Sequence, residues 1–162
     1  MRRMSVKNVV VDPNSQQPVV LLADELGRYM LPIVVGGAEA MAISMQLEGT
    51  SYPRPLTHDL MKTLLEASLT AVEQVVVCDL QDSVFYARVY LATREGQVTI
   101  DARPSDAIAL ALRIPCPILC EDQVLEAAGI DLTELQDVLD EEGELDDRFK
   151  QIMDSLELPP PE

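Results

Sequence analysis

Residues 101–113, where the pattern predicts that a strand passes into a helix, constrain the fold of this chain more than any other stretch. Every residue from 107 to 112 is apolar. A helix that is apolar on every side is buried all round, so this segment predicts a central core helix rather than an amphipathic surface helix. Ser105 is the expected N-cap, because its hydroxyl can accept a free backbone N–H and Pro104 disfavours helix before it.

The start of this helix carries three charged residues, Asp101, Arg103 and Asp106. An unpaired buried charge is very costly, so these side chains need partners. One interpretation is a structural ion pair in which Arg103 binds Asp101 or Asp106; the other is a ligand or metal site. On residue type alone the structural interpretation is favoured, because ion-pair networks also produce such clusters.

Hydrophobic patterns and turn residues predict an α+β (mixed α/β) domain that alternates strands and helices. Pro32 indicates an edge or a bulge in the third strand. The expected strands cover residues 5–12, 19–23, 28–35, 71–79, 84–93, 97–101 and 118–120. The expected helices cover 38–47, a segment that begins at an N-cap Thr57, the buried segment after residue 104, and 121–128. In the helix after Thr57, the apolar side chains expected to face inward are Leu60, Met61, Leu64 and Leu65.

A weak internal similarity occurs at an offset of 67 residues. Residues 31–33 match 98–100, and residues 39–43 match 106–110. Each copy predicts a strand, a break, an acidic residue in the first helical turn, and a helix of small apolar residues. The expected architecture is therefore two halves of similar build, each a strand meander followed by a helix, in one compact domain.

The net charge of −16 is concentrated in the C-terminal part of the chain. Residues 131–162 carry a net charge of −10, which leaves −6 for residues 1–130. This contrast predicts a folded domain over 1–130 and an acidic helical tail over 131–162, in which residues 144–156 have an amphipathic face for the body or for a protein partner. The charge disfavours nucleic acid as a partner, because proteins that bind phosphate backbones normally show a positive surface.

No apolar run approaches the length that crosses a bilayer, and the first residues lack a signal-peptide core, which predicts a cytoplasmic protein with no membrane partner. The three cysteines suggest neither a disulfide framework nor a zinc site.

Two Arg-Pro dipeptides, at Arg54 and Arg103, each precede a Ser or Thr and then an aspartate. If both helix N-termini face one cleft, their N–H groups, guanidinium groups and carboxylates suit a phosphate or a metal-bridged phosphodiester. The single histidine, His58, lies between Thr57 and Asp59. It is either a general base or a structural side chain at the helix start.

Three segments resemble the bifunctional nuclease family of bacteria and plants: YPRPLTHDL at residues 52–60, FYA at 85–87 and DARPSDAIALALR at 101–113. The resemblance covers residues 5–130, and residues 140–156 resemble the acidic C-terminal extension of some bacterial members. It implies an α/β or α+β fold, self-association with a dimer as the expected form, and DNase and RNase activity.

The motif positions that the resemblance carries over, together with Glu39 from the first helix, define two hypotheses. In the first, the chain is a nuclease of low sequence specificity that uses Mg²⁺ or Mn²⁺. In the second, the same residues are structural ion pairs in a non-catalytic regulatory or scaffolding domain that self-associates and binds a protein partner. For the nuclease, the expected catalytic residues are His58, Asp59, Asp101 and Asp106, the phosphate-binding residues Arg54, Arg103, Thr57 and Ser105, and the metal ligands Asp59, Asp101, Asp106 and Glu39.

Overall fold

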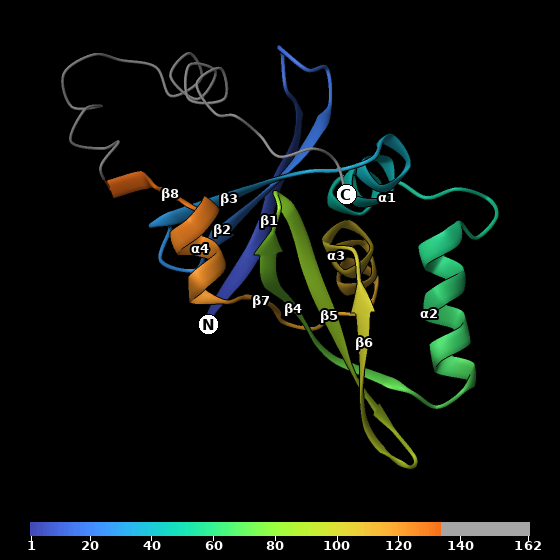
Figure 1. Cartoon of the computed structure of the whole chain (residues 1–162). Helices are drawn as coiled ribbons and strands as arrows, with labels where there is room; N and C mark the ends of the chain where they lie inside the picture. The colour runs from blue at the N-terminus through green and yellow to red at the C-terminus, as the bar shows by residue number, and fades with distance from the viewer. Residues whose placement is uncertain (134–162) are drawn as a thin grey trace.

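The computed structural model of the chain describes residues 1–133, which form one mixed sheet and a set of helices packed against it (Figure 1). The expected helix in residues 144–156 lies outside the described residues. The strands are β1 (Arg2–Val11), β2 (Pro18–Asp24), β3 (Tyr29–Val34), β4 (Ala71–Gln81), β5 (Val84–Thr93), β6 (Gly96–Ala102), β7 (Ile118–Cys120) and β8 (Ile130–Asp131). The helices are α1 (Gly37–Glu48), α2 (Thr57–Ala67), α3 (Pro104–Arg113) and α4 (Asp122–Ala128).

The strand order β6-β5-β4-β7-β1-β2-β3-β8 confirms the α+β prediction and the two halves of similar build. Strands β1, β2 and β3 form one antiparallel meander followed by α1, and β4, β5 and β6 form a second one followed, after β6, by α3. Strand β7 joins the two, since it is antiparallel to β1 and parallel to β4. The short β8, which the sequence did not predict, pairs with the first two residues of β3. Pro32 lies beyond that pairing, where no strand within residues 1–133 pairs with the outer side of β3.

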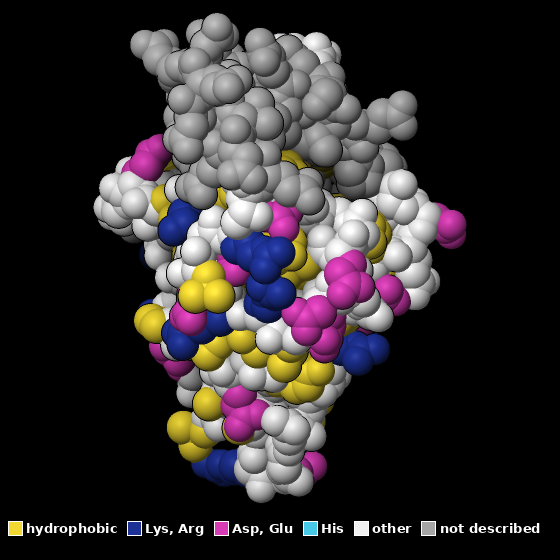
Figure 2. Space-filling model, turned by 90° about the vertical axis from the view of Figure 1, so that its left-hand side faces the viewer, with side chains coloured by type: hydrophobic (Ala, Val, Ile, Leu, Met, Phe, Trp, Pro, Cys, Tyr) yellow, Lys and Arg dark blue, Asp and Glu magenta, His cyan; other side chains and the backbone are white. Residues whose placement is uncertain are grey.

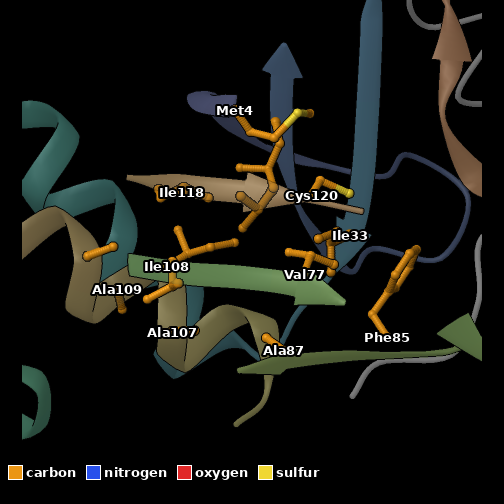
Figure 3. Packing of buried hydrophobic residues seen from close by; sticks show 14 of the residues in the cluster. Met4, Ile33, Val77, Phe85, Ala87, Ala107, Ile108, Ala109, Ile118 and Cys120 are labelled. Atoms are coloured by element: carbon orange, nitrogen blue, oxygen red, sulfur yellow. The ribbon is translucent and has the colours of Figure 1, made fainter. Parts of the chain in front are cut away.

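Helix α3 occupies the centre of the helix layer, where it contacts α1, α2, β4 and β5 (Figure 1). Its residues 107–111 are all buried, as the apolar pattern predicts. Figure 3 shows Ala107, Ile108 and Ala109 of this helix against strand side chains such as Val77 and Ile118. The segment around Asp101 and Arg103 is thereby fixed between an outer strand and the core helix.

Helix α2 lies differently from the sequence expectation. Leu60 and Leu64 are 54% and 60% exposed, whereas Met61 and Leu65 pack against the core. The expectation that all four apolar side chains face inward was therefore wrong for Leu60 and Leu64. Periodicity identifies residues that share a helix face, but α2 lies at the end of the helix layer, where the described elements cover a narrower strip.

None of the described helices is long and apolar enough to cross a bilayer.

Candidate functional site

A groove of about 750 Å³ opens between α2, α3 and the ends of β5 and β6. Most of its wall is aliphatic, and the polar groups gather at the helix starts. The residues that line it are Thr57, Met61, Leu64, Leu65, Val89, Leu91, Ile100, Asp101, Ala102, Arg103, Asp106, Ala107 and Leu110. A concave, mainly apolar surface with a few convergent polar groups is typical of a ligand site.

Arg103 is the centre of a charged cluster at this groove, which we call the outer network (Glu39, His58, Arg103 and Asp106). Its Nε donates to Asp106 Oδ2 at 2.8 Å, and its Nη2 contacts the same oxygen at 2.7 Å and Glu39 Oε1 at 2.8 Å. Both carboxylates raise the pKa of Arg103, so the guanidinium stays charged. Because the Arg103 side chain is 48% exposed, it can still meet a ligand while its orientation is fixed.

His58 joins the outer network through a 2.9 Å contact between its Nε2 and Asp106 Oδ1. This contact links the starts of α2 and α3. His58 is buried and is not among the residues that line the groove. It therefore contacts Asp106 from the protein interior, on the side away from the groove. A role of His58 in proton transfer stays a prediction.

The starts of the helices share one feature: the third residue of each of α1, α2 and α3 is acidic, namely Glu39, Asp59 and Asp106. Negative charge is favourable at this end of a helix. Glu39 lies close over Gly36, where a Cβ atom would collide with its carboxylate. Glycine at the N-cap of α1 thus allows Glu39 to lie beside Arg103.

The predicted N-caps were both wrong by one or more residues. Helix α3 begins at Pro104 with Arg103 as N-cap, so Ser105 is the second helical residue and is buried. Proline is well suited to the first helical position. A backbone N–H at that position has no partner within the helix, so its absence costs nothing, and the φ angle of proline is already helical. In α2 the N-cap is Leu56 and Thr57 is the first helical residue, and the Asp59 carboxylate accepts the backbone N–H of Leu56 at 2.8 Å.

Asp59 belongs to a second cluster, the inner network (Asp59 and Arg113 with the carbonyls of Ala42 and Ala109). Arg113 Nε donates to Asp59 Oδ1 at 2.7 Å, Nη1 to Ala109 O at 2.8 Å and Nη2 to Ala42 O at 3.1 Å. The N–H of Leu56 and the Arg113 guanidinium hold the pKa of Asp59 below its usual value. Asp59 does not line the groove, so the structure separates it from Asp101 and Asp106.

Sequence reasoning assigned no role to Arg113, although it ends a helix that is otherwise apolar. An arginine at the end of a buried helix was the available signal, because a charge in that position must find partners inside the protein. Its side chain is 3% exposed, and within residues 1–133 no buried side-chain nitrogen or oxygen lacks a hydrogen-bond partner.

Asp101 and Arg54 lack ion pairs within residues 1–133. Asp101 lies near the end of β6 and lines the groove, opposite Arg88 in the strand register. Arg54 is exposed in the loop before α2 and does not line the groove. The ion pair between Arg103 and Asp106 that the sequence suggested is thus present, whereas Asp101 has no ion pair within the described residues.

Among the described residues, no three His, Cys, Asp or Glu side chains gather in an arrangement that could hold a metal ion by themselves. Asp106 already contacts Arg103 and His58 through both oxygens. Mg²⁺ often binds one or two carboxylates together with substrate phosphates, and Asp101 and Asp106 are the carboxylate residues that line the groove. Asp59 and Glu39 are engaged by arginines.

On the side that carries α4 and β8, arginines are interleaved with carboxylates (Figure 2). There Arg2 contacts Asp24 and Asp122, and Arg28 contacts Asp131. This face therefore does not present the continuous positive surface that a phosphate backbone normally requires.

Comparison with known proteins points to one family. A family model described as the bifunctional nuclease domain matches residues 20–133. An uncharacterized protein of Mycobacterium tuberculosis is 36% identical over 96% of this chain and 95% of its own length. Bifunctional nuclease 1 of Oryza sativa is 27% identical over 74% of this chain, and bifunctional nuclease 2 of Arabidopsis thaliana is 26% identical over 62% of it. The aligned part is 37% of the rice protein and 31% of the Arabidopsis protein.

Proposed function

The chain belongs to the bifunctional nuclease family, and we propose that it hydrolyses phosphodiester bonds in DNA and RNA at the groove beside α3. The observation that carries the proposal is the Arg103 guanidinium, which two carboxylates hold in place while half of its surface faces solvent at the groove. A positioned guanidinium stabilises the negative charge that develops on phosphate oxygens during hydrolysis.

The other groove residues have distinct roles in this proposal. Asp101 accepts the proton of the attacking water and is the first candidate ligand for a divalent cation. Thr57 and the backbone N–H groups in the first turn of α2 bind phosphate oxygens. Asp106 positions Arg103, and His58 positions Asp106.

The proposal includes Mg²⁺ or Mn²⁺, which would neutralise phosphate charge and lower the pKa of a bound water. Asp59 does not take part in this site, because Arg113 and the N–H of Leu56 occupy its oxygens. Low sequence specificity is expected, because the polar groups of the groove suit phosphate oxygens, and contacts to phosphate do not read the base sequence.

The test is a nuclease assay of the purified full chain on DNA and on RNA, with Mg²⁺, Mn²⁺ or EDTA. Arg103→Ala and Asp101→Asn are each expected to lower the cleavage rate by about 100-fold, the usual effect of removing a preorganised electrostatic group. Matched controls are Arg3→Ala, a surface arginine on β1, and Asp82→Asn, in the turn between β4 and β5. No cleavage with any ion, or equal loss in the controls, contradicts the proposal.

A second function, that of a non-catalytic scaffold, is supported by the inner network. Asp59, which the motif places beside His58, serves with Arg113 to join helices. The net charge of −16 also fits a protein partner better than a nucleic acid. If Arg103→Ala changes the affinity for a protein partner but the wild-type chain cuts no nucleic acid, this function replaces the first.

A further inference from the structure

The two edges of the sheet differ in whether a further strand pairs with them. At one edge, β8 pairs with the start of β3, and Arg28 binds Asp131 of β8. At the other edge, no strand within residues 1–133 pairs with the outer side of β6. Every residue of β6 except Ala102 is exposed, so a row of backbone N–H and C=O groups faces outward.

Strand β6 also lacks the features that usually keep an edge from pairing. Natural edge strands carry lysine, proline or a bulge. Residues 96–102 contain neither lysine nor proline, and the pairing of β5 with β6 has no register shift. Val98 and Ile100 are exposed at 41% and 45%. This edge is therefore suited to accept another strand.

We propose that the strand is β6 of a second copy of this chain, paired antiparallel across a two-fold axis at Thr99. In this register Val98 lies opposite Ile100 of the partner subunit and Gln97 lies opposite its Asp101. Glu95, just before β6, lies opposite Arg103, just after it. The segment from Glu95 to Arg103 is therefore complementary to itself, with apolar pairs within β6 and an opposite-charge pair at each of its ends, which is what an isologous interface requires.

Helix α2 also favours a second copy of this chain as the partner at β6. It lines the groove together with Ile100, Asp101 and Ala102 at the end of β6. Leu60 and Leu64, one helical turn apart, are both exposed, and Leu64 lines the groove. A two-fold axis at β6 brings α2 of both copies to one interface, so the paired strands gain apolar contact in addition to backbone hydrogen bonds.

The pairing affects the groove as well. Asp101 and Arg103 lie at its mouth, so the partner's Gln97 and Glu95 come close to the mouth in the dimer. The proposal does not depend on nuclease activity, and its test measures association alone.

The first test is the mass of the full chain in solution by sedimentation, from 2 to 200 µM protein, an interval set around a dissociation constant of about 10 µM. Val98→Lys places a charge on the edge and is expected to weaken the dimer at least ~20-fold. Leu26→Lys is the control, because Leu26 is 86% exposed in the turn between β2 and β3. A wild-type monomer at all concentrations, or a dimer that Val98→Lys leaves unchanged, overturns the proposal.

The second test fixes the register and does not depend on how Val98→Lys folds. Thr99→Cys places two sulfurs opposite each other at the axis, and mild oxidation is expected to give a covalent dimer. Gln97→Cys is the control, because its two copies are separated by four residue positions, too far for a disulfide. The wild-type chain, oxidised in parallel, accounts for Cys78, Cys116 and Cys120. Equal dimer yield from Gln97→Cys and Thr99→Cys would overturn this register.

Discussion

The inner and outer networks join the same three helices with the same chemistry, but their arginines lie at different depths. In each, a carboxylate at the third position of a helix binds an arginine at one end of α3. Arg113, 3% exposed, reaches Asp59 of α2 and the carbonyl of Ala42 in α1. Arg103, 48% exposed, reaches Glu39 of α1 and, through Asp106, His58 of α2.

The difference in burial between Arg113 and Arg103 suits the first to stability and the second to function. The buried Arg113 guanidinium must keep its partners, because a single buried charge without them is very unfavourable, even though the Asp59 side chain is 38% exposed. The Arg103 ion pairs contribute less to stability, since water and salt screen a guanidinium that is half exposed. The inner network can therefore hold the helices in place while Arg103 and Asp106 remain accessible at the groove. Each of the following experiments tests whether the inner network serves stability and the outer network serves function.

The largest effect is expected for Arg113→Ala, a loss of about 3 kcal/mol in the free energy of unfolding. The variant removes a buried guanidinium and leaves the carbonyl of Ala42 and the carboxylate of Asp59 without this donor. Urea unfolding followed by circular dichroism measures the loss. Arg88→Ala, at an exposed position of β5, is the control. A loss below 1 kcal/mol would mean that the inner network does not hold the helices together.

Asp59→Asn tests the inner network by its dependence on pH. The folded pKa of Asp59 lies below its ordinary value, about 3.9, so the folded state binds this proton less readily than the unfolded chain does. The charged carboxylate therefore stabilises the fold fully above about pH 4, and that stabilisation is lost as the pH falls through the folded pKa. The wild type is expected to exceed Asp59→Asn in stability at pH 7, by a margin that shrinks as the pH falls below about 4. Urea midpoints across this range measure the margin, and a margin independent of pH contradicts the assignment.

The strand meanders and the core helix could be predicted because their signals are local. Alternation in β5 and the uninterrupted apolar run of α3 follow from the chain itself, and so does the contact of Arg103 with Asp106, three residues apart. The internal similarity also indicated that Glu39 and Asp106 start equivalent helices. Both acidic residues in fact contact Arg103.

The inner network could not be predicted because its partners are 54 residues apart in the chain. Nothing in the spacing of Asp59 distinguishes it from Asp106, and only the packing of the helices places one on Arg113 and the other on Arg103. The exposure of Leu60 and Leu64 has a related cause, since a periodic pattern does not specify how wide a surface the neighbouring elements cover.

Arg103→Ala is expected to lower the proposed nuclease activity far more than it lowers stability. Its cost in the free energy of unfolding should be at most ~1 kcal/mol, because the Arg103 side chain is half exposed. The proposed nuclease rate should fall by about 100-fold in the same variant. Urea unfolding and the cleavage assay, run on one preparation, test both values. A loss of stability as large as that of Arg113→Ala would make the outer network structural.

The smallest effect concerns salt. Raising NaCl from 0.05 to 1 M shortens the screening length from roughly 14 Å to 3 Å and weakens exposed ion pairs far more than buried ones. The stability difference between wild type and Arg103→Ala should therefore fall by about half, a few tenths of a kcal/mol. The difference for Arg113→Ala should stay constant over the same range, because Arg113 is buried among Asp59 and backbone carbonyls. Parallel urea titrations at the two salt concentrations measure both differences. An equal response to salt would show that the two networks do not differ in electrostatic environment, despite their difference in burial.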